Sequence, residues 1–182
     1  MPQLFYIVGA SGAGKDSLMD YARLRINGSS PVLFAHRYIT RPPKEGNENH
    51  VYISPEEFRL RRENGLFALH WISHGLYYGI GKEIDIWMKN GFHVVVNGSR
   101  QYLPVAIECY PDLVTIVIEA DPDVIRRRLV SRGRETAQDI EKRLQRQPDQ
   151  WNGTVGRISI HNNGPLEEGG NALVAALGVE PS

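Results

Sequence analysis

The segment near the N-terminus combines an apolar strand, a glycine-rich loop and a helix in that order. Residues 4–8 are apolar or aromatic, residues 9–17 read Gly-Ala-Ser-Gly-Ala-Gly-Lys-Asp-Ser, and apolar residues then recur at helical spacing up to Arg25. Glycines let backbone N–H groups converge on phosphate oxygens, and the start of a helix adds its positive dipole end. Lys15 can reach the terminal phosphates from this position. The segment therefore predicts a P-loop that binds a nucleoside triphosphate.

One position of this loop departs from the usual motif. The Ser or Thr that normally follows the lysine and binds Mg²⁺ is replaced by Asp16, and Ser17 comes next. A carboxylate in the first turn of a helix is favourable because of the helix dipole. A carboxylate is also a ligand that suits Mg²⁺. Both interpretations stay open, and Asp16 and Ser17 are the candidate metal ligands. The predicted ATP-binding residues of the loop are Gly9, Ala10, Ser11, Gly12, Ala13, Gly14, Lys15, Asp16 and Ser17.

Composition limits the class of protein. A chain of 182 residues with 21 basic and 21 acidic side chains fits one domain, and its balanced charge disfavours nucleic-acid and membrane partners. The lone Cys109 excludes an internal disulfide, and we expect it to be a small core residue. No apolar run approaches transmembrane length, and a strand beginning at residue 4 leaves no room for a signal peptide. These features favour a cytoplasmic enzyme.

Apolar segments of strand and helix length alternate along the chain, which is typical of a parallel sheet covered by helices on both faces. Residues 37–80 interrupt the alternation and predict an inserted lobe, which in P-loop kinases holds the phosphate acceptor. Residues 126–146 are rich in basic side chains and predict a second, helical lobe. The strands are predicted at residues 4–8, 32–35, 92–96, 113–119 and 157–161, with short strands within residues 66–78. The helices are predicted at residues 15–25, 55–64, 82–89, 122–129, from 136 onward and at 166–177.

These segments predict one α/β domain of three layers around a parallel central sheet. Its core would comprise residues 1–36, 81–125 and 147–182. The acceptor lobe would comprise residues 37–80, and a basic lid residues 126–146.

Several motifs together resemble the guanylate kinase family over nearly the whole chain. The matching segments are residues 9–17, 40–46, 53–58, 77–79, 128–133 and 142–144, with Asn162 near the end. The resemblance implies that Arg41, Lys44 and Tyr78 hold the acceptor's phosphate. It also implies that Arg128 and Asn162 contact ATP. The catalytic residues would be Lys15, Arg132 and Arg143, the two arginines closing over the transferring phosphoryl group.

The departures from that family concern the acceptor. Leu69 and Ile80 stand where guanylate kinases read guanine, and neither can pair with a polar base edge. Asn97 and Ser99 replace two carboxylates, and His50 replaces a phosphate-binding tyrosine. We therefore expect an acceptor that carries a phosphate but no guanine.

Gly-Lys-Asp-Ser in the loop and Asn-Gly-Ser-Arg at residues 97–100 are similar to one branch of that family, the ribose 1,5-bisphosphate phosphokinases of bacterial phosphonate catabolism. This resemblance implies transfer of the γ-phosphoryl group of ATP to the 1-phosphate of ribose 1,5-bisphosphate, with Mg²⁺. The products would be 5-phosphoribosyl 1-diphosphate and ADP. The candidate substrate-binding residues are Arg41, Lys44, His50, Tyr78, Asn97 and Arg100.

Alternatives remain at this point. The chain could be a guanylate kinase or another nucleoside monophosphate kinase, or an inactive guanylate-kinase-like module that binds proteins. The cations at positions 41 and 44 could be ordinary loop charges, His50 a solvated side chain and Tyr78 a packing residue. The predicted partners are the small molecules ATP and ribose 1,5-bisphosphate. The oligomeric state stays open, with a homodimer as one candidate.

Overall fold

The computed structural model describes residues 1–28, 30–42, 49–133, 136–145 and 156–179, without the side chains of residues 132, 142, 143 and 145. The elements in chain order are β1 (Leu4–Gly9), α1 (Lys15–Ile26), β2 (Val32–Phe34), β3 (Arg37–Ile39), β4 (His50–Tyr52), α2 (Pro55–Glu63), β5 (Phe67–Ser73), β6 (Leu76–Gly81), α3 (Glu83–Lys89), β7 (His93–Asn97), α4 (Leu103–Cys109), β8 (Val114–Glu119), α5 (Pro122–Arg132), α6 (Ala137–Gln145), β9 (Arg157–His161) and α7 (Leu166–Ala176).

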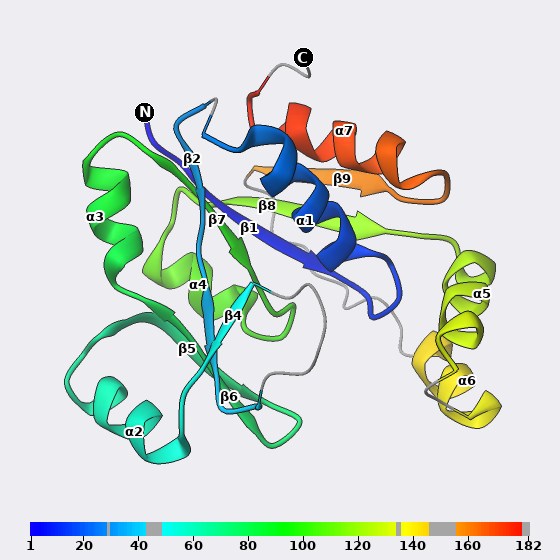
Figure 1. The fold of residues 1–182 in the computed structure, drawn as a ribbon, viewed down its shortest axis with the longest axis horizontal. Coiled ribbons are helices and arrows are strands. Elements are labelled where there is room, and N and C mark those ends of the chain that lie inside the picture. Colours follow the sequence, from blue (N-terminus) through cyan, green and yellow to red (C-terminus); the bar gives the residue numbers. More distant parts are fainter. Residues whose placement is uncertain (29, 43–48, 134–135, 146–155, 180–182) are drawn as a thin grey trace.

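The central sheet has the strand order β2-β7-β1-β8-β9, and all its neighbouring strands are parallel. Helices α1 and α7 cover one face, and α3 and α4 cover the other (Figure 1). The side chains of strand β1 alternate between the two helical layers. Phe5 and Ile7 pack toward α1 and α7, while Leu4, Tyr6 and Val8 pack toward α3 and α4. Strands buried on both faces need apolar residues at every position. The predicted three-layer α/β fold and its five central strands are confirmed.

A second sheet, β4-β3-β6-β5, lies beside the carboxyl ends of the central strands (Figure 1). Its β3–β6 and β5–β6 pairs are antiparallel, and its β3–β4 pair is parallel. Helix α2 packs on the second sheet through Phe58. The centroid of the Phe58 ring lies 4.7 Å from that of Phe67 and 5.2 Å from that of Tyr77. The hydroxyl of Ser54 accepts a hydrogen bond from the Glu57 N–H at 3.1 Å, which caps the N-terminus of this helix.

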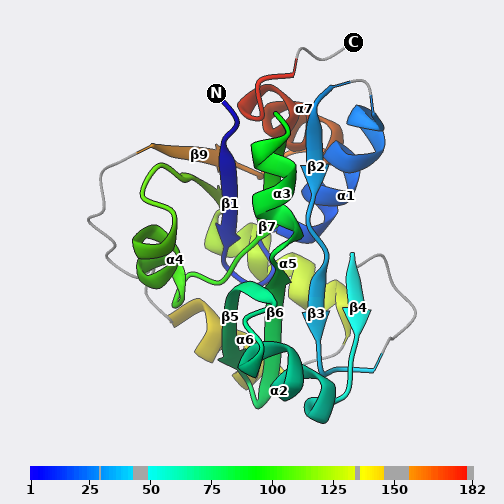
Figure 2. The ribbon, with the colours of Figure 1, turned by 90° about the vertical axis from the view of Figure 1, so that its left-hand side faces the viewer.

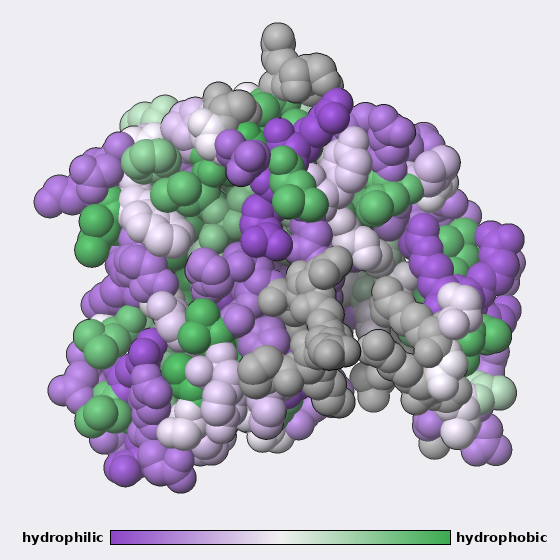
Figure 3. Space-filling view, in the orientation of Figure 1, coloured by the Kyte–Doolittle hydropathy of each residue, from purple (hydrophilic) through white to green (hydrophobic). Residues whose placement is uncertain are grey.

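Helices α5 and α6 lie across from the second sheet, also near the carboxyl ends of the central strands (Figure 1). Contacts among Ile125, Leu129 and Ile140 pack the two helices together. The molecule is notched at its lower edge between this pair and the second sheet (Figure 3). Strands β1, β7 and β8 all end at the notched side, because parallel strands present their carboxyl ends together. Ligands of open α/β sheets bind at such ends.

Three elements were not predicted, namely β3, β4 and α4, and the prediction for Cys109 was wrong. Cys109 is exposed at the end of α4. Helix α4 buries Leu103 and Ala106, which lie one turn apart, and Cys109 falls on its solvent side. Among the described residues, no helix has the length and apolar character needed to cross a membrane.

Candidate active site

The P-loop joins the end of β1 to the start of α1 and depends on two glycines. Gly12 and Gly14 adopt positive φ angles of 86° and 89°, which favour glycine. A Cβ atom on Gly14 would lie 2.4 Å from Nδ2 of Asn162. The loop therefore takes its shape because two of its residues have no side chain.

Two residues that are distant from the loop in the sequence hold it in place. The Asn162 amide donates a hydrogen bond to the Ala13 carbonyl at 2.8 Å, and the Arg128 guanidinium donates to the same oxygen at 3.3 Å. Oδ1 of Asn162 is buried and has no hydrogen-bond partner among the described residues. Arg128 lies on α5 and Asn162 just after β9. Both predicted ATP-binding residues thus lie against the loop, and their contact with ATP stays a prediction.

The P-loop is also tied to the neighbouring strand β7. Lys15 Nζ donates a hydrogen bond to Asn97 Oδ1, and the Asn97 amide donates to Asp16 Oδ1 at 2.9 Å. Lys15 Nζ also donates to the same Asp16 oxygen at 3.2 Å. Asn97 is largely buried, whereas the carboxylate of Asp16 is exposed to solvent. These three side chains form one cluster at the carboxyl edge of the sheet.

The electrostatics of this cluster favour an ionised Asp16. Desolvation opposes ionisation of Asp16, but Lys15 and Arg37 outweigh it and hold the pKa of the carboxyl below its usual value. Desolvation lowers the pKa of Lys15 to about 8, although Asp16 acts in the opposite direction. An exposed carboxylate that stays ionised beside a phosphate-binding lysine can contact a divalent cation.

The second sheet contributes a group of basic and aromatic side chains. The Arg37 guanidinium lies over the Tyr78 ring, 5.6 Å from its centroid, and Arg37 is only 9% exposed. Arg37 pairs with His50 across β3 and β4. Burial first, and then the charges of Arg41 and Arg37, lower the pKa of His50, so its imidazole is neutral near pH 7. The arrangement can receive an anion between the second sheet and the P-loop.

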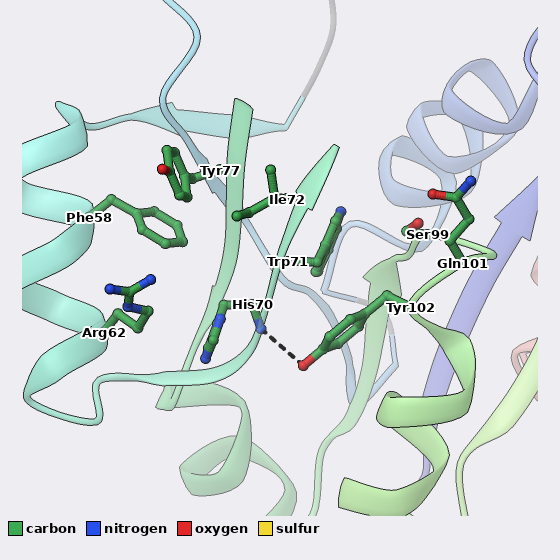
Figure 4. Close-up of a pocket in the computed structure, with 9 residues that line it drawn as sticks. All are labelled: Phe58, Arg62, His70, Trp71, Ile72, Tyr77, Ser99, Gln101 and Tyr102. Carbon is green, nitrogen blue, oxygen red and sulfur yellow. Dashed lines mark hydrogen bonds between the residues drawn. The ribbon is translucent and has the colours of Figure 1, made fainter. Parts of the chain in front are cut away.

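A cavity of about 380 Å³ lies along β5, the edge strand of the second sheet. Figure 4 shows side chains from α2 and β6 on one side of β5, and side chains from the segment after β7 on the other. The Tyr102 hydroxyl accepts a hydrogen bond from the His70 N–H at 3.4 Å. The lining residues are Phe58, Arg62, His70, Trp71, Ile72, Tyr77, Ser99, Gln101 and Tyr102. The lining residues include none of the described candidate phosphate-binding residues, but Trp71 in the cavity wall stacks on the ring of the candidate Tyr78.

Similar proteins identify the family, although no protein-family model matches the chain. Ribose 1,5-bisphosphate phosphokinase PhnN of Desulfomicrobium baculatum is 52% identical over 177 residues, covering 97% of this chain and 95% of that protein. The protein of the same name from Thiobacillus denitrificans is 50% identical over 176 residues, covering 96% of this chain and 92% of that protein. The chain belongs to the ribose 1,5-bisphosphate phosphokinase family.

Solved structures show the fold of this phosphokinase family member. Guanylate kinase from Anaplasma phagocytophilum superposes with a TM-score of 0.66 at 16% identity, covering 97% of this chain and 84% of that chain. A gluconokinase from Sinorhizobium meliloti superposes with a TM-score of 0.52 at 19% identity, covering 97% of this chain and 92% of that chain. The guanylate-kinase-like P-loop kinase fold is therefore confirmed.

The resemblance assigns guanine recognition to two positions that this phosphokinase family member fills with apolar side chains. Leu69 and Ile80 are fully buried and lie opposite each other on β5 and β6. A one-residue irregularity between Phe67 and Leu69 turns Phe67 toward α2 and Leu69 toward the central core. Trp71 lies on the same side, with ring centroids 5.5 Å from Tyr78 and 5.4 Å from Tyr102. This face therefore offers packed apolar and aromatic surface.

The structure brings together Lys15, Asp16 and Asn97. It also places Tyr78 under the Arg37 guanidinium, and His50 opposite Arg37 in the pairing of β3 with β4. Arg100 lies in the turn between β7 and α4, where its carbonyl accepts a hydrogen bond from the Leu103 N–H. Lys44 and the side chains of Arg132 and Arg143 lie outside the described residues, so their roles stay predictions. Sequence reasoning missed Arg37. The one available signal was a basic residue shortly after the apolar residues 32–35 and directly before Tyr38 and Ile39, at the start of an unassigned strand.

The turn after Asn97 depends on Tyr6. The Tyr6 hydroxyl accepts a hydrogen bond from the Ser99 N–H at 3.0 Å and donates one to the Ser99 carbonyl at 3.2 Å. We expect Tyr6→Phe to lower the free energy of unfolding by about 1–3 kcal/mol, because both backbone groups lose their partner. Denaturant unfolding measures this, with the exposed Tyr52→Phe as the control. A loss below about 0.5 kcal/mol would contradict the assignment.

Proposed function

We propose that the chain transfers the γ-phosphoryl group of ATP to the 1-phosphate of ribose 1,5-bisphosphate. The products are 5-phosphoribosyl 1-diphosphate and ADP. The observation that carries the proposal is the acceptor side of the site, where Leu69 and Ile80 present no polar group while Arg37, Arg41 and His50 suit a phosphate. Two relatives that are about half identical over nearly the whole chain bear the name of this activity.

The chemistry needs neutralisation of charge more than proton transfer. An oxygen of the acceptor's 1-phosphate forms a bond to the γ-phosphorus, and the bond from that phosphorus to the bridging oxygen of ADP breaks. The attacking phosphate is already ionised near pH 7, so the step requires no general base. Lys15 lies where it can bind the β- and γ-phosphates. Arg132 and Arg143 are proposed to stabilise the charge that spreads over the transferring group.

Mg²⁺ is the proposed cofactor, and the residues present fit it. Asp16 is exposed and ionised at the start of α1, and its hydrogen bonds with Lys15 and Asn97 both use Oδ1. Asp16 would hold the ion, with the hydroxyl of Ser17 as a second candidate ligand. A bound Mg²⁺ neutralises phosphate charge. Asn97 orients the Asp16 carboxylate, and Lys15 balances its charge.

The remaining parts of the proposal concern the surroundings of the enzyme. Residues 37–80 are proposed as the acceptor lobe and residues 126–146 as the lid. The partners are proposed to be small molecules, with no nucleic acid or membrane among them, because the basic and acidic side chains balance at 21 each. A cytoplasmic location and, as one candidate, a homodimer complete the proposal.

Two other functions are disfavoured by particular residues. A guanylate kinase would need polar groups where Leu69 and Ile80 are buried. An inactive protein-binding module would not need the P-loop lysine, yet Lys15 is held at the carboxyl edge by Asn97.

The acceptor preference tests the proposal. We expect kcat/KM for ribose 1,5-bisphosphate to exceed that for GMP by at least about two orders of magnitude, because a site without hydrogen-bonding partners leaves guanine unpaired. A coupled assay of ADP release measures both acceptors. Lys15→Ala serves as the control for contaminating kinases and should fall to background. Comparable kcat/KM values for the two acceptors would contradict the proposal and favour a guanylate kinase.

The role of Asp16 is tested by the Mg²⁺ dependence of the same assay. If Asp16 binds the metal, Asp16→Ala should raise the Mg²⁺ concentration for half-maximal activity by about tenfold, because one ligand is lost and no hydroxyl replaces it. Asp20→Ala, one helical turn further along α1, is the matched control and should titrate like the unmodified enzyme. If the Asp16→Ala curve overlays the unmodified one, the carboxylate only stabilises the start of helix α1 through the helix dipole.

A further inference from the structure

Asn97 stands on backbone that is held by strand β1. It ends β7, where it pairs with Ile7, and the next residue, Gly98, donates its N–H to the Ile7 carbonyl at 2.8 Å. A Cβ atom on Gly98 would overlap the Tyr6 ring, and the Tyr6 hydroxyl forms hydrogen bonds with both backbone groups of Ser99. Two residues of β1 therefore fix the backbone that carries the Asn97 side chain.

The side chain of Asn97 is directed to the P-loop. Its Oδ1 accepts a hydrogen bond from Lys15 Nζ, and its Nδ2 donates one to Asp16 Oδ1 at 2.9 Å. Asn97 is 8% exposed, and the side chain of Lys15 is 15% exposed. A lysine has a flexible four-carbon stem, so an acceptor that is fixed in place reduces the conformational freedom that Lys15 must lose when it binds a phosphate.

Two of the acceptor-binding candidates, His50 and Tyr78, lie instead in the second sheet, on β4 and β6. Figure 2 shows this sheet beyond the carboxyl ends of the central strands, with β3 following β2 almost end to end. The hydrogen bonds that the Asn97 side chain makes with described residues go to Lys15 and Asp16. Its contacts therefore belong to the donor side of the site, although it ends a strand where an acceptor could also bind.

We propose that Asn97 is a positioning residue for Lys15 and does not bind the acceptor. This inference rests on the proposed function. The amide oxygen is a neutral acceptor, so it holds the ammonium group at the carboxyl edge of the sheet and leaves its charge available to the donor phosphates. An apolar side chain at position 97 would remove that acceptor, and a carboxylate would add a second negative charge beside Asp16.

Asn97→Leu should therefore weaken nucleotide binding and leave acceptor binding unchanged. We expect the dissociation constant of ADP to rise by about tenfold or more, because the hydrogen bond that holds the charged lysine is lost. Titration calorimetry in EDTA measures it without any contribution from Mg²⁺. The rise in melting temperature that ribose 1,5-bisphosphate causes in the absence of nucleotide should stay the same. Asn90→Leu is the matched control, since Asn90 is exposed at the end of α3, where its amide donates to the Ile86 carbonyl.

A double-mutant cycle tests whether Asn97 acts through Lys15. In the Lys15→Ala background, Asn97→Leu should change the dissociation constant of ADP by less than about twofold, because the side chain that Asn97 positions is already absent. Weakening of the same size in both backgrounds would overturn the inference, since Asn97 would then act on the nucleotide directly or through the fold.

Exchange of the two side chains gives a measurement that does not need residual binding by Lys15→Ala. Asn97→Asp alone should weaken binding of ADP in EDTA by about tenfold or more, because a second carboxylate repels the phosphates. Asp16→Asn combined with Asn97→Asp again leaves one amide and one carboxylate beside Lys15. This exchanged variant should bind ADP within about threefold of the unmodified enzyme. Equal weakening in the single and exchanged variants would contradict the inference.

The acceptor measurement separates this inference from the proposed function. The melting temperature of free Asn97→Leu shows that the variant is folded. Loss of its stabilisation by ribose 1,5-bisphosphate, with unchanged ADP binding, would overturn the inference and make Asn97 an acceptor ligand. If ribose 1,5-bisphosphate is not turned over by the unmodified enzyme and does not stabilise it, the proposed function fails. The ADP measurements then still decide whether Asn97 positions Lys15.

Discussion

The side chain of Asn97 connects the end of β7 to the P-loop, and the geometry of the donor side depends on it. Its amide oxygen accepts from Lys15 while its amide nitrogen donates to Asp16. An amide can do both, whereas an ionised carboxylate has no proton to donate. A carboxylate at position 97 would instead face the carboxylate of Asp16. Two of the departures from the guanylate kinase pattern, Asp16 in the loop and Asn97 on the strand, are therefore complementary.

On the acceptor side, apolar packing and positive charge together determine which groups are available to bind a ligand. Leu69, Trp71 and Ile80 fill the side of the second sheet that faces the central core, together with the Tyr78 ring. Arg37 lies over that ring. Packing of this kind removes hydrogen-bonding groups that could recognise a base and leaves the cations as the groups available for recognition. A small phosphorylated sugar suits such a site better than a nucleotide.

The parts of the fold predicted correctly were those with long, regular signals. The strands of the central sheet could be predicted because both faces of the sheet are buried, which requires unbroken apolar runs. The P-loop could be predicted because its glycines and lysine stand between a strand and a helix. Strands β3 and β4 span three residues each and have no periodic pattern. Cys109 was predicted wrongly because its exposure depends on which face α4 turns to the core. Arg37 could not be identified from the sequence, since its importance lies in its burial against the Tyr78 ring and its position opposite His50 in the second sheet.

The most direct test of the central claim, that this site phosphorylates a phosphate, is ³¹P NMR of the product formed from ribose 1,5-bisphosphate, ATP and Mg²⁺. The account predicts a pair of mutually coupled diphosphate resonances that belong to the sugar, an unchanged 5-phosphate resonance and a matching amount of ADP. Release of inorganic phosphate without a new sugar diphosphate would contradict it. A new phosphate monoester on a sugar hydroxyl would contradict it equally.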